Sequence, residues 1–115
     1  MLNVPSTMPI FLYTQPTDMR KGFDGLSGIV RQALGADPLD GSLFLFVNRR
    51  RDRLKILHFD GTGFWLYYKR LEAGTFEKIA SNGPSVEIDA TQLAMLLGGV
   101  SLVSATRRKR YRRAS

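Results

Sequence analysis

Clusters of arginine and lysine are the residues whose type and spacing point most directly to chemistry in this sequence. The densest cluster comprises Arg107, Arg108, Lys109, Arg110, Arg112 and Arg113. Guanidinium groups pair with phosphate at two points at once, and a polybasic segment can follow a phosphate backbone. These six residues carry most of the net charge of +7, because the other eleven basic residues face ten acidic ones. We predict that this tail binds a polyanion, nucleic acid before membrane; the alternative is a solubilising end without a specific partner.

A second basic cluster lies between two predicted strands and continues onto their first residues. Its members, with one residue of the following strand, are Arg49, Arg50, Arg51, Arg53, Lys55 and Arg70. Basic groups beside Tyr68 on one sheet face are typical of a surface that contacts a nucleic-acid backbone. We therefore predict a hairpin tip that binds DNA. The alternative is a solvated turn whose charges discourage pairing at the sheet edge.

A third basic pair, Arg20 and Lys21, lies at a predicted helix start. Free backbone amides at a helix N-terminus, together with two cations, can hold a phosphate group. The structural interpretation, which we favour, is a capped helix end at which Asp18 pairs with a neighbouring basic side chain.

Residues for catalysis or metal binding are sparse. The chain has no cysteine, and its single histidine, His58, has no histidine or cysteine neighbour at metal-ligand spacing. Asp60 and Asp89 already have local explanations as turn and cap residues, and no phosphate-binding glycine loop is present. We therefore expect no catalytic residue, no metal and no cofactor. The absence of cysteine, of a signal-like N-terminus and of a long apolar run predicts a cytoplasmic protein that is neither exported nor membrane-embedded.

The apolar pattern predicts the elements that would position these residues. Strands are expected at 9–14, 43–47, 53–59 and 64–70, with a short one at 86–88. A first helix should be capped by Thr17 or Asp18 and stop at Gly35, and a second should follow Asp89 with Gln92 at its third position. The fold class is α+β: a small antiparallel β-meander or sheet packed with two short helices. One domain should span residues 1–105, followed by a basic, flexible tail at 106–115.

Counting outward from the turn at 60–63 predicts the pairing of the two longest strands. Phe59 should lie opposite Phe64, His58 opposite Trp65, and so on to Lys55 opposite Tyr68. One sheet face is then expected to carry Phe44, Phe46, Leu54, Ile56, Trp65 and Tyr67, and the other Leu43, Leu45, Val47, Leu57, Phe59, Phe64 and Leu66. Because both faces are apolar, we expect both to be covered, by helices, by the N-terminal strand segment or by another subunit.

Several segments together resemble one transposon-encoded family. They are DMRKGFDGL at 18–26, DP at 37–38, GSLFLF at 41–46, DRLKIL at 52–57, DG at 60–61, KRLE at 69–72 and QLAMLL at 92–97. In this order they are similar to the small second-reading-frame accessory protein, TnpB, of insertion sequence 66 elements. The resemblance covers about residues 10–102. It implies a protein without assigned catalytic activity that supports transposition beside a separate acidic-triad transposase.

The function predicted from these observations is that of a non-catalytic accessory factor for transposition of an insertion sequence. It would bind DNA phosphates without sequence specificity and assist the transposase, and it could self-associate. The alternative is a protein-interaction subunit that docks the transposase through Trp65, Tyr67 and the apolar sheet without binding DNA directly.

Overall fold

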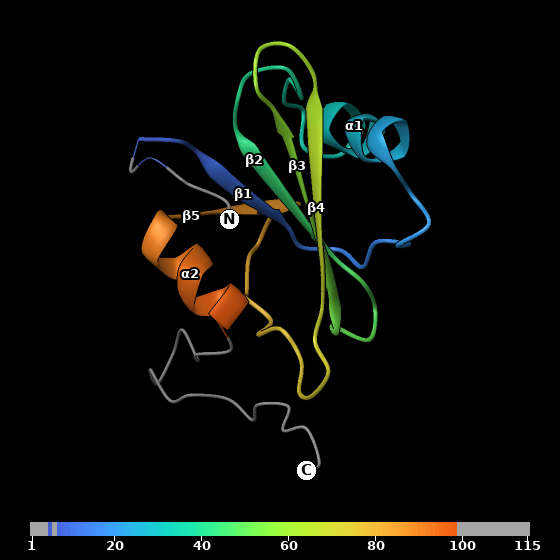
Figure 1. The fold of residues 1–115 in the computed structure, drawn as a ribbon, viewed down its shortest axis with the longest axis vertical. Coiled ribbons are helices and arrows are strands. Elements are labelled where there is room, and N and C mark those ends of the chain that lie inside the picture. The colour runs from blue at the N-terminus through green and yellow to red at the C-terminus, as the bar shows by residue number, and fades with distance from the viewer. Residues whose placement is uncertain (1–4, 6, 99–115) are drawn as a thin grey trace.

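The computed structural model describes Pro5 and residues 7–98 (Figure 1). Its elements are β1 (Ile10–Tyr13), α1 (Phe23–Gln32), β2 (Leu43–Val47), β3 (Arg53–Phe59), β4 (Phe64–Arg70), β5 (Ser85–Ile88) and α2 (Ala90–Gly98). The expected α+β class is confirmed. The predicted boundary between a domain at 1–105 and a tail at 106–115 lies outside the described residues. Neither of the two helices is long and apolar enough to cross a membrane.

The five strands form one mixed sheet in the order β4-β3-β2-β1-β5. Strands β2, β3 and β4 make the predicted antiparallel meander, whereas β1 pairs in parallel with β2 and antiparallel with β5. A parallel pair needs a crossover connection, and α1 lies within the segment that supplies it. The N-terminal strand is thus part of the sheet and does not cover one of its faces.

Both faces of the sheet are covered, as the two apolar faces predicted. Figure 1 shows α1 and α2 on opposite sides of the twisted sheet. On the α1 side, Leu26 and Val30 join a buried cluster with residues of β2 and β3. On the other side, Leu93 and Leu96 of α2 join a larger cluster together with Phe76, which belongs to the segment before β5.

The predicted grouping of side chains on the two faces is wrong for β2. Phe44 pairs with Leu57 and Phe46 with Lys55, so both phenylalanines share the α1 face with Leu57. The other β2 residues, led by Leu45, lie on the α2 face with Ile56. A shift of one residue moves a whole strand to the opposite face. The turn between β2 and β3 sets this register.

The predicted register between β3 and β4 is confirmed along its whole length, from Phe59 opposite Phe64 to Lys55 opposite Tyr68. The carboxylate of Asp60 organises the connecting turn by accepting hydrogen bonds from the backbone N–H groups of Thr62 and Gly63 and from the indole of Trp65. These bonds, first among them the one from the backbone N–H of Thr62, hold the pKa of Asp60 well below its usual range.

The expected start of α1 is wrong by about one helical turn. The helix begins at Phe23, and the residue before it, Gly22, has no side chain that could cap it. Asp18 lies four residues before Gly22, in a separate turn. The Asp18 carboxylate accepts a hydrogen bond from the backbone N–H of Arg20 at 2.9 Å. Local bonds of this kind compete with helix formation. The expected stop is correct, because Gly35 has a φ of 63° and follows the last turn.

A reciprocal capping box starts α2, as the sequence predicted. The N–H of Gln92 donates to the Asp89 carboxylate at 2.7 Å, and the N–H of Asp89 donates to the Gln92 side chain at 2.8 Å. This short helix carries Leu93 and Leu96 into the larger core cluster. The cap therefore supports the packing of one whole sheet face.

The Asp89→Ala variant should lose the cap and about 1 kcal/mol of stability, measured by urea denaturation. The matched control is Glu87→Ala, because Glu87 is an exposed carboxylate two residues away on β5. Equal losses in the two variants would contradict the role of the cap.

Candidate nucleic-acid interface

The second basic cluster of the sequence contributes Arg49, Arg50 and Arg53 to an open groove of about 570 Å³, and the residues just before Arg20 line its other side. One wall is the loop before α1 and the other is the turn between β2 and β3. The lining residues are Pro16, Thr17, Asp18, Met19, Asn48, Arg49, Arg50, Asp52 and Arg53. Residues some thirty positions apart thus form one surface, which we call the basic groove.

The side chain of Asn48 builds the turn that forms one wall. Its oxygen accepts the backbone N–H groups of Asp52 and Arg53, both at 3.0 Å, and its Nδ2 donates to the Asp52 carboxylate at 2.7 Å. The bond from Asn48, helped by the positive charges of Arg50 and Arg53, lowers the pKa of Asp52. Sequence reasoning assigned Asn48 no role, although asparagine before a turn is a signal for such bonding.

The loop that forms the other wall is tied to the sheet at Thr17, whose N–H donates to the carbonyl of Val47 at 2.9 Å. Next to it, Asp18 and Arg20 form an ion pair of 2.6 Å, as the structural interpretation of this cluster predicted. The Arg20 guanidinium, through its side-chain hydrogen bonds, lowers the pKa of Asp18 to about 2. Asp18, one of the two acids that line the groove, is therefore already paired within its own loop.

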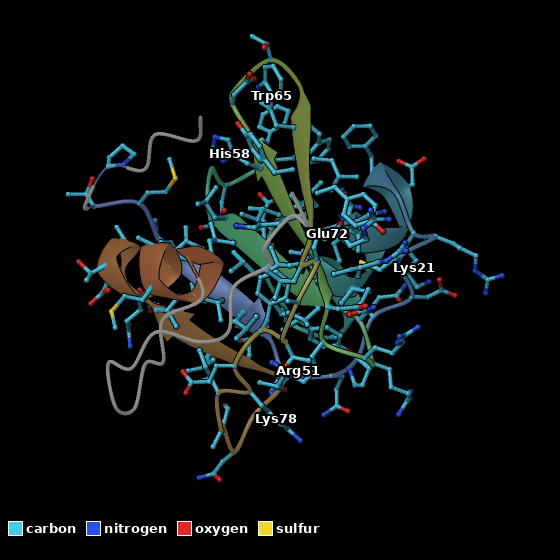
Figure 2. All side chains as sticks on the ribbon, turned by 60° about the horizontal axis from the view of Figure 1, so that its bottom comes forward. Lys21, Arg51, His58, Trp65, Glu72 and Lys78 are labelled. Atoms are coloured by element: carbon cyan, nitrogen blue, oxygen red, sulfur yellow. The ribbon has the colours of Figure 1, made fainter. Side chains whose placement is uncertain are left out.

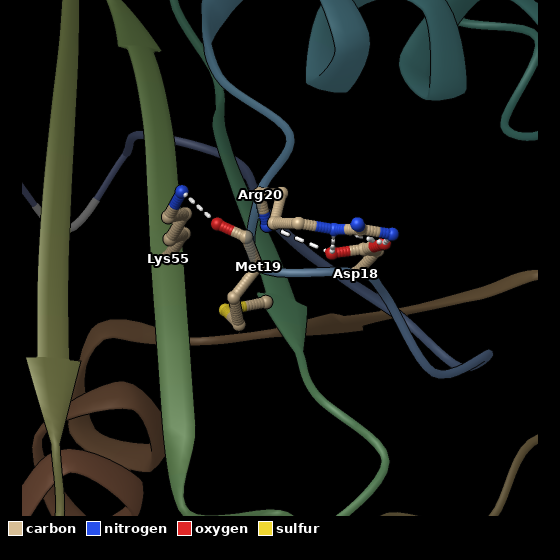
Figure 3. Close-up of polar contacts among 4 residues, drawn as sticks. All are labelled: Asp18, Met19, Arg20 and Lys55. Carbon is tan, nitrogen blue, oxygen red and sulfur yellow. Dashed lines mark hydrogen bonds and ion pairs between the residues drawn. The ribbon is translucent and has the colours of Figure 1, made fainter.

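Lys55 of β3 binds the same loop. Lys55 is 6% exposed, and its amine donates to the carbonyl of Met19 at 2.6 Å (Figure 3) and to that of Lys21 at 2.8 Å. The amine also lies 4.8 Å from the centre of the Tyr68 ring. Lys55 shares a face with Tyr68 as expected, but its amine is used inside the protein, so we leave it out of the proposed DNA surface.

Arg51 is likewise engaged within the protein. Its backbone has a φ of 62°, which is unusual for a residue other than glycine. Its guanidinium donates to the carbonyls of Phe76 at 3.0 Å and Glu77 at 2.6 Å, and Figure 2 shows it beside the segment that carries Lys78. Arg51 therefore links the turn to the segment that covers the α2 face of the sheet.

The remaining predicted DNA-binding residues are more accessible. Arg49 and Arg50 are exposed on the turn, and Lys21 is exposed beside α1 (Figure 2). Arg53 is half-buried and donates to the Tyr68 hydroxyl at 3.1 Å. Arg70, opposite Arg53 in the sheet, is exposed and pairs with Glu72 at 2.8 Å. The tail cluster, from Arg107 to Arg113, lies outside the described residues.

Away from the groove, His58 and Trp65 lie opposite one another near the end of the β3–β4 hairpin (Figure 2). His58 is half-buried, and Trp65 is 55% exposed and stacked on Tyr67 with 6.2 Å between ring centres. Within Pro5 and residues 7–98, no group of three or more His, Cys, Asp or Glu residues is arranged to hold a metal ion.

Comparison with known proteins places this chain in a family. A family model described as IS66 Orf2-like protein matches residues 8–107, which include every strand and helix described above. The chain belongs to the IS66 Orf2-like family. This confirms the resemblance seen in the sequence, and the family indicates an accessory protein associated with transposition.

Two relatives of this IS66 Orf2-like protein come from Sinorhizobium fredii (strain NBRC 101917 / NGR234). Uncharacterized protein y4hO is 38% identical over 100 residues, which cover 87% of each chain. Uncharacterized protein y4jC is 34% identical over 99 residues, which cover 86% of this chain and 85% of the relative. No solved structure matches the chain.

The Lys55→Met variant should lose about 2 kcal/mol of stability, because the carbonyls of Met19 and Lys21 then lack their buried donor. Urea denaturation measures this loss. Lys78→Met is the control, since Lys78 is exposed. A Lys55→Met protein as stable as the control would contradict this role.

The Asp18 carboxyl should titrate near pH 2 in carbon-detected NMR, and in Arg20→Gln its pKa should rise toward the ordinary value of 3.8. A carboxylate with a lowered folded-state pKa stabilises the fold above its ordinary pKa and loses this contribution as the pH falls through the folded-state pKa. An unchanged titration in Arg20→Gln would show that the ion pair does not set the pKa of Asp18.

Proposed function

We propose that this IS66 Orf2-like protein is a non-catalytic DNA-binding factor that assists a separate transposase. In this proposal the basic groove and the arginine-rich tail contact DNA phosphates without reading base sequence. The observation that carries the proposal is the meeting of the loop at 16–19 and the turn at 48–53 along one open groove.

The charges of the groove support contact with phosphate. Its two acids are engaged locally, Asp18 by Arg20 and Asp52 by Asn48. Arg49 and Arg50 are exposed at the tip of the turn, where their planar guanidinium groups can pair with phosphate oxygens. Because the turn is fixed by Asn48 and the loop by Lys55, the basic side chains project from a defined backbone.

The tail would supply the larger share of the affinity. Its six basic residues can each neutralise a phosphate, and each neutralised phosphate contributes a slope of about −0.9 to the logarithm of the binding constant against the logarithm of salt concentration. Contacts between the tail and phosphate groups would not distinguish one base sequence from another. Any sequence preference would therefore have to come from the groove.

The test is a salt series of binding to labelled duplexes, one with a transposon-end sequence and one scrambled. Truncation after Ala105 should reduce the magnitude of the salt slope by up to about 5, and Arg49→Gln with Arg50→Gln by about 2. The matched control is Arg31→Gln with Lys78→Gln, which removes the same charge from exposed positions outside the groove. It should leave the slope nearly unchanged.

Equal effects of the groove and control variants would contradict a phosphate-binding groove. If the full chain binds neither duplex at moderate salt, the DNA proposal fails. The second candidate, docking of the transposase, then becomes the better one. It is favoured by a specific observation, because Trp65 is 55% exposed and stacked on Tyr67 on the α2 face of the sheet.

A further inference from the structure

The sheet has one long edge, and its exposed groups suit pairing with another strand. Within the described residues, β4 pairs only with β3 and extends over seven residues, whereas β5 at the opposite edge has four. Proteins commonly blunt such edges by keeping them short. Strand β4 is not short, and it also carries two exposed aromatic side chains, Trp65 at 55% and Tyr68 at 50%.

The hydrogen bonds at the two ends of the hairpin show which backbone groups face this edge. The backbone N–H of Asp60 donates to the carbonyl of Gly63, the residue opposite it. At the other end, the backbone N–H of Leu71 donates to the carbonyl of Asp52, the residue opposite it. Hydrogen-bonded and non-hydrogen-bonded pairs alternate along an antiparallel ladder. The odd-numbered residues of β4 therefore bond to β3, and its even-numbered residues, from Phe64 to Arg70, direct their N–H and C=O groups outward.

We propose that β4 pairs antiparallel with β4 of a second copy of this chain, with the two-fold axis at Tyr67, to form one continuous sheet. This register uses all seven residues of the strand and all its outward backbone groups. Leu66 then lies opposite Tyr68 of the second copy, and Phe64 opposite Arg70, as hydrogen-bonded pairs. Such an interface is isologous, with the same patch used on both copies.

The side chains of β4 are self-complementary in this register. Lys69 lies opposite Trp65 of the second copy and Arg70 opposite Phe64, so that each basic residue of the strand lies beside an aromatic ring. The charged ends stay paired within their own copy, Lys69 with the carbonyl of Leu97 and Arg70 with Glu72. Parallel in-register pairing would place Lys69 opposite Lys69 and Arg70 opposite Arg70, which is unfavourable. The two charges at one end of β4 thus select an antiparallel second copy as its occupant.

The first measurement is the mass of the purified full chain in DNA-free buffer by sedimentation equilibrium. The expected result is a concentration-dependent species of twice the 12.9 kDa chain mass. A chain that stays monomeric at its highest soluble concentration would overturn the proposal and leave the edge to a strand of another protein.

Cysteine cross-linking then tests the register, because the chain has no cysteine of its own. Residues of a non-hydrogen-bonded pair have Cα atoms about 4.5 Å apart, within the usual range for a disulfide. Under mild oxidation, Tyr67→Cys should cross-link to itself, and reduction should restore the single chain. Trp65→Cys and Lys69→Cys should each stay uncross-linked alone and cross-link when mixed.

The mixed pair keeps the test informative if Tyr67→Cys fails to fold, because Trp65 and Lys69 are both exposed. Self-cross-linking of Trp65→Cys would overturn the register at Tyr67. A wild-type dimer in which the mixture of Trp65→Cys and Lys69→Cys does not cross-link would show that another surface forms the interface.

Discussion

The buried amine of Lys55 constrains the arrangement of the whole α1 side of this protein. An amine taken out of water must find acceptors, because leaving it unpaired costs several kcal/mol. Here the acceptors are the carbonyls of Met19 and Lys21, which lie in a loop without regular secondary structure. The loop is thereby fixed against β3, and its earlier residues are placed beside the turn at 48–53 to make the basic groove.

The arginines of the central cluster differ sharply in what they do. Arg51 donates to the carbonyls of Phe76 and Glu77, so its charge helps to hold the segment that places Phe76 in the larger core cluster. Arg49 and Arg50, the two arginines that precede it, are exposed. One short basic run thus supplies both internal hydrogen bonds, from Arg51, and a surface suited to phosphate. The hydrogen bonds of Arg51 fix the position from which Arg49 and Arg50 project.

The covered faces and the open edge of the sheet suggest how such a protein takes part in an assembly. With α1 on one face and α2 with Phe76 on the other, the described strands expose two large aromatic side chains to a partner, Trp65, which stacks on Tyr67, and Tyr68 on the opposite face. The backbone edge of β4 remains, and it lies on the same strand as that aromatic pair. Self-association and DNA contact would then use different surfaces, since the groove is lined by the loop and turn and not by β4.

The sequence by itself determined the family, the α+β class, the meander of β2, β3 and β4, the β3–β4 register and the Asp89–Gln92 cap. These features depend on neighbouring residues: alternating apolar positions, a four-residue turn with Asp60, and a capping box. Only the tertiary structure decided the face on which Phe44 lies and the uses of Lys55 and Arg51. Their physical causes are the Asn48 turn and hydrogen bonds to carbonyls 25 to 36 residues away. Backbone carbonyls have no residue-type signature, so no local pattern could reveal which of them a buried lysine or arginine would meet.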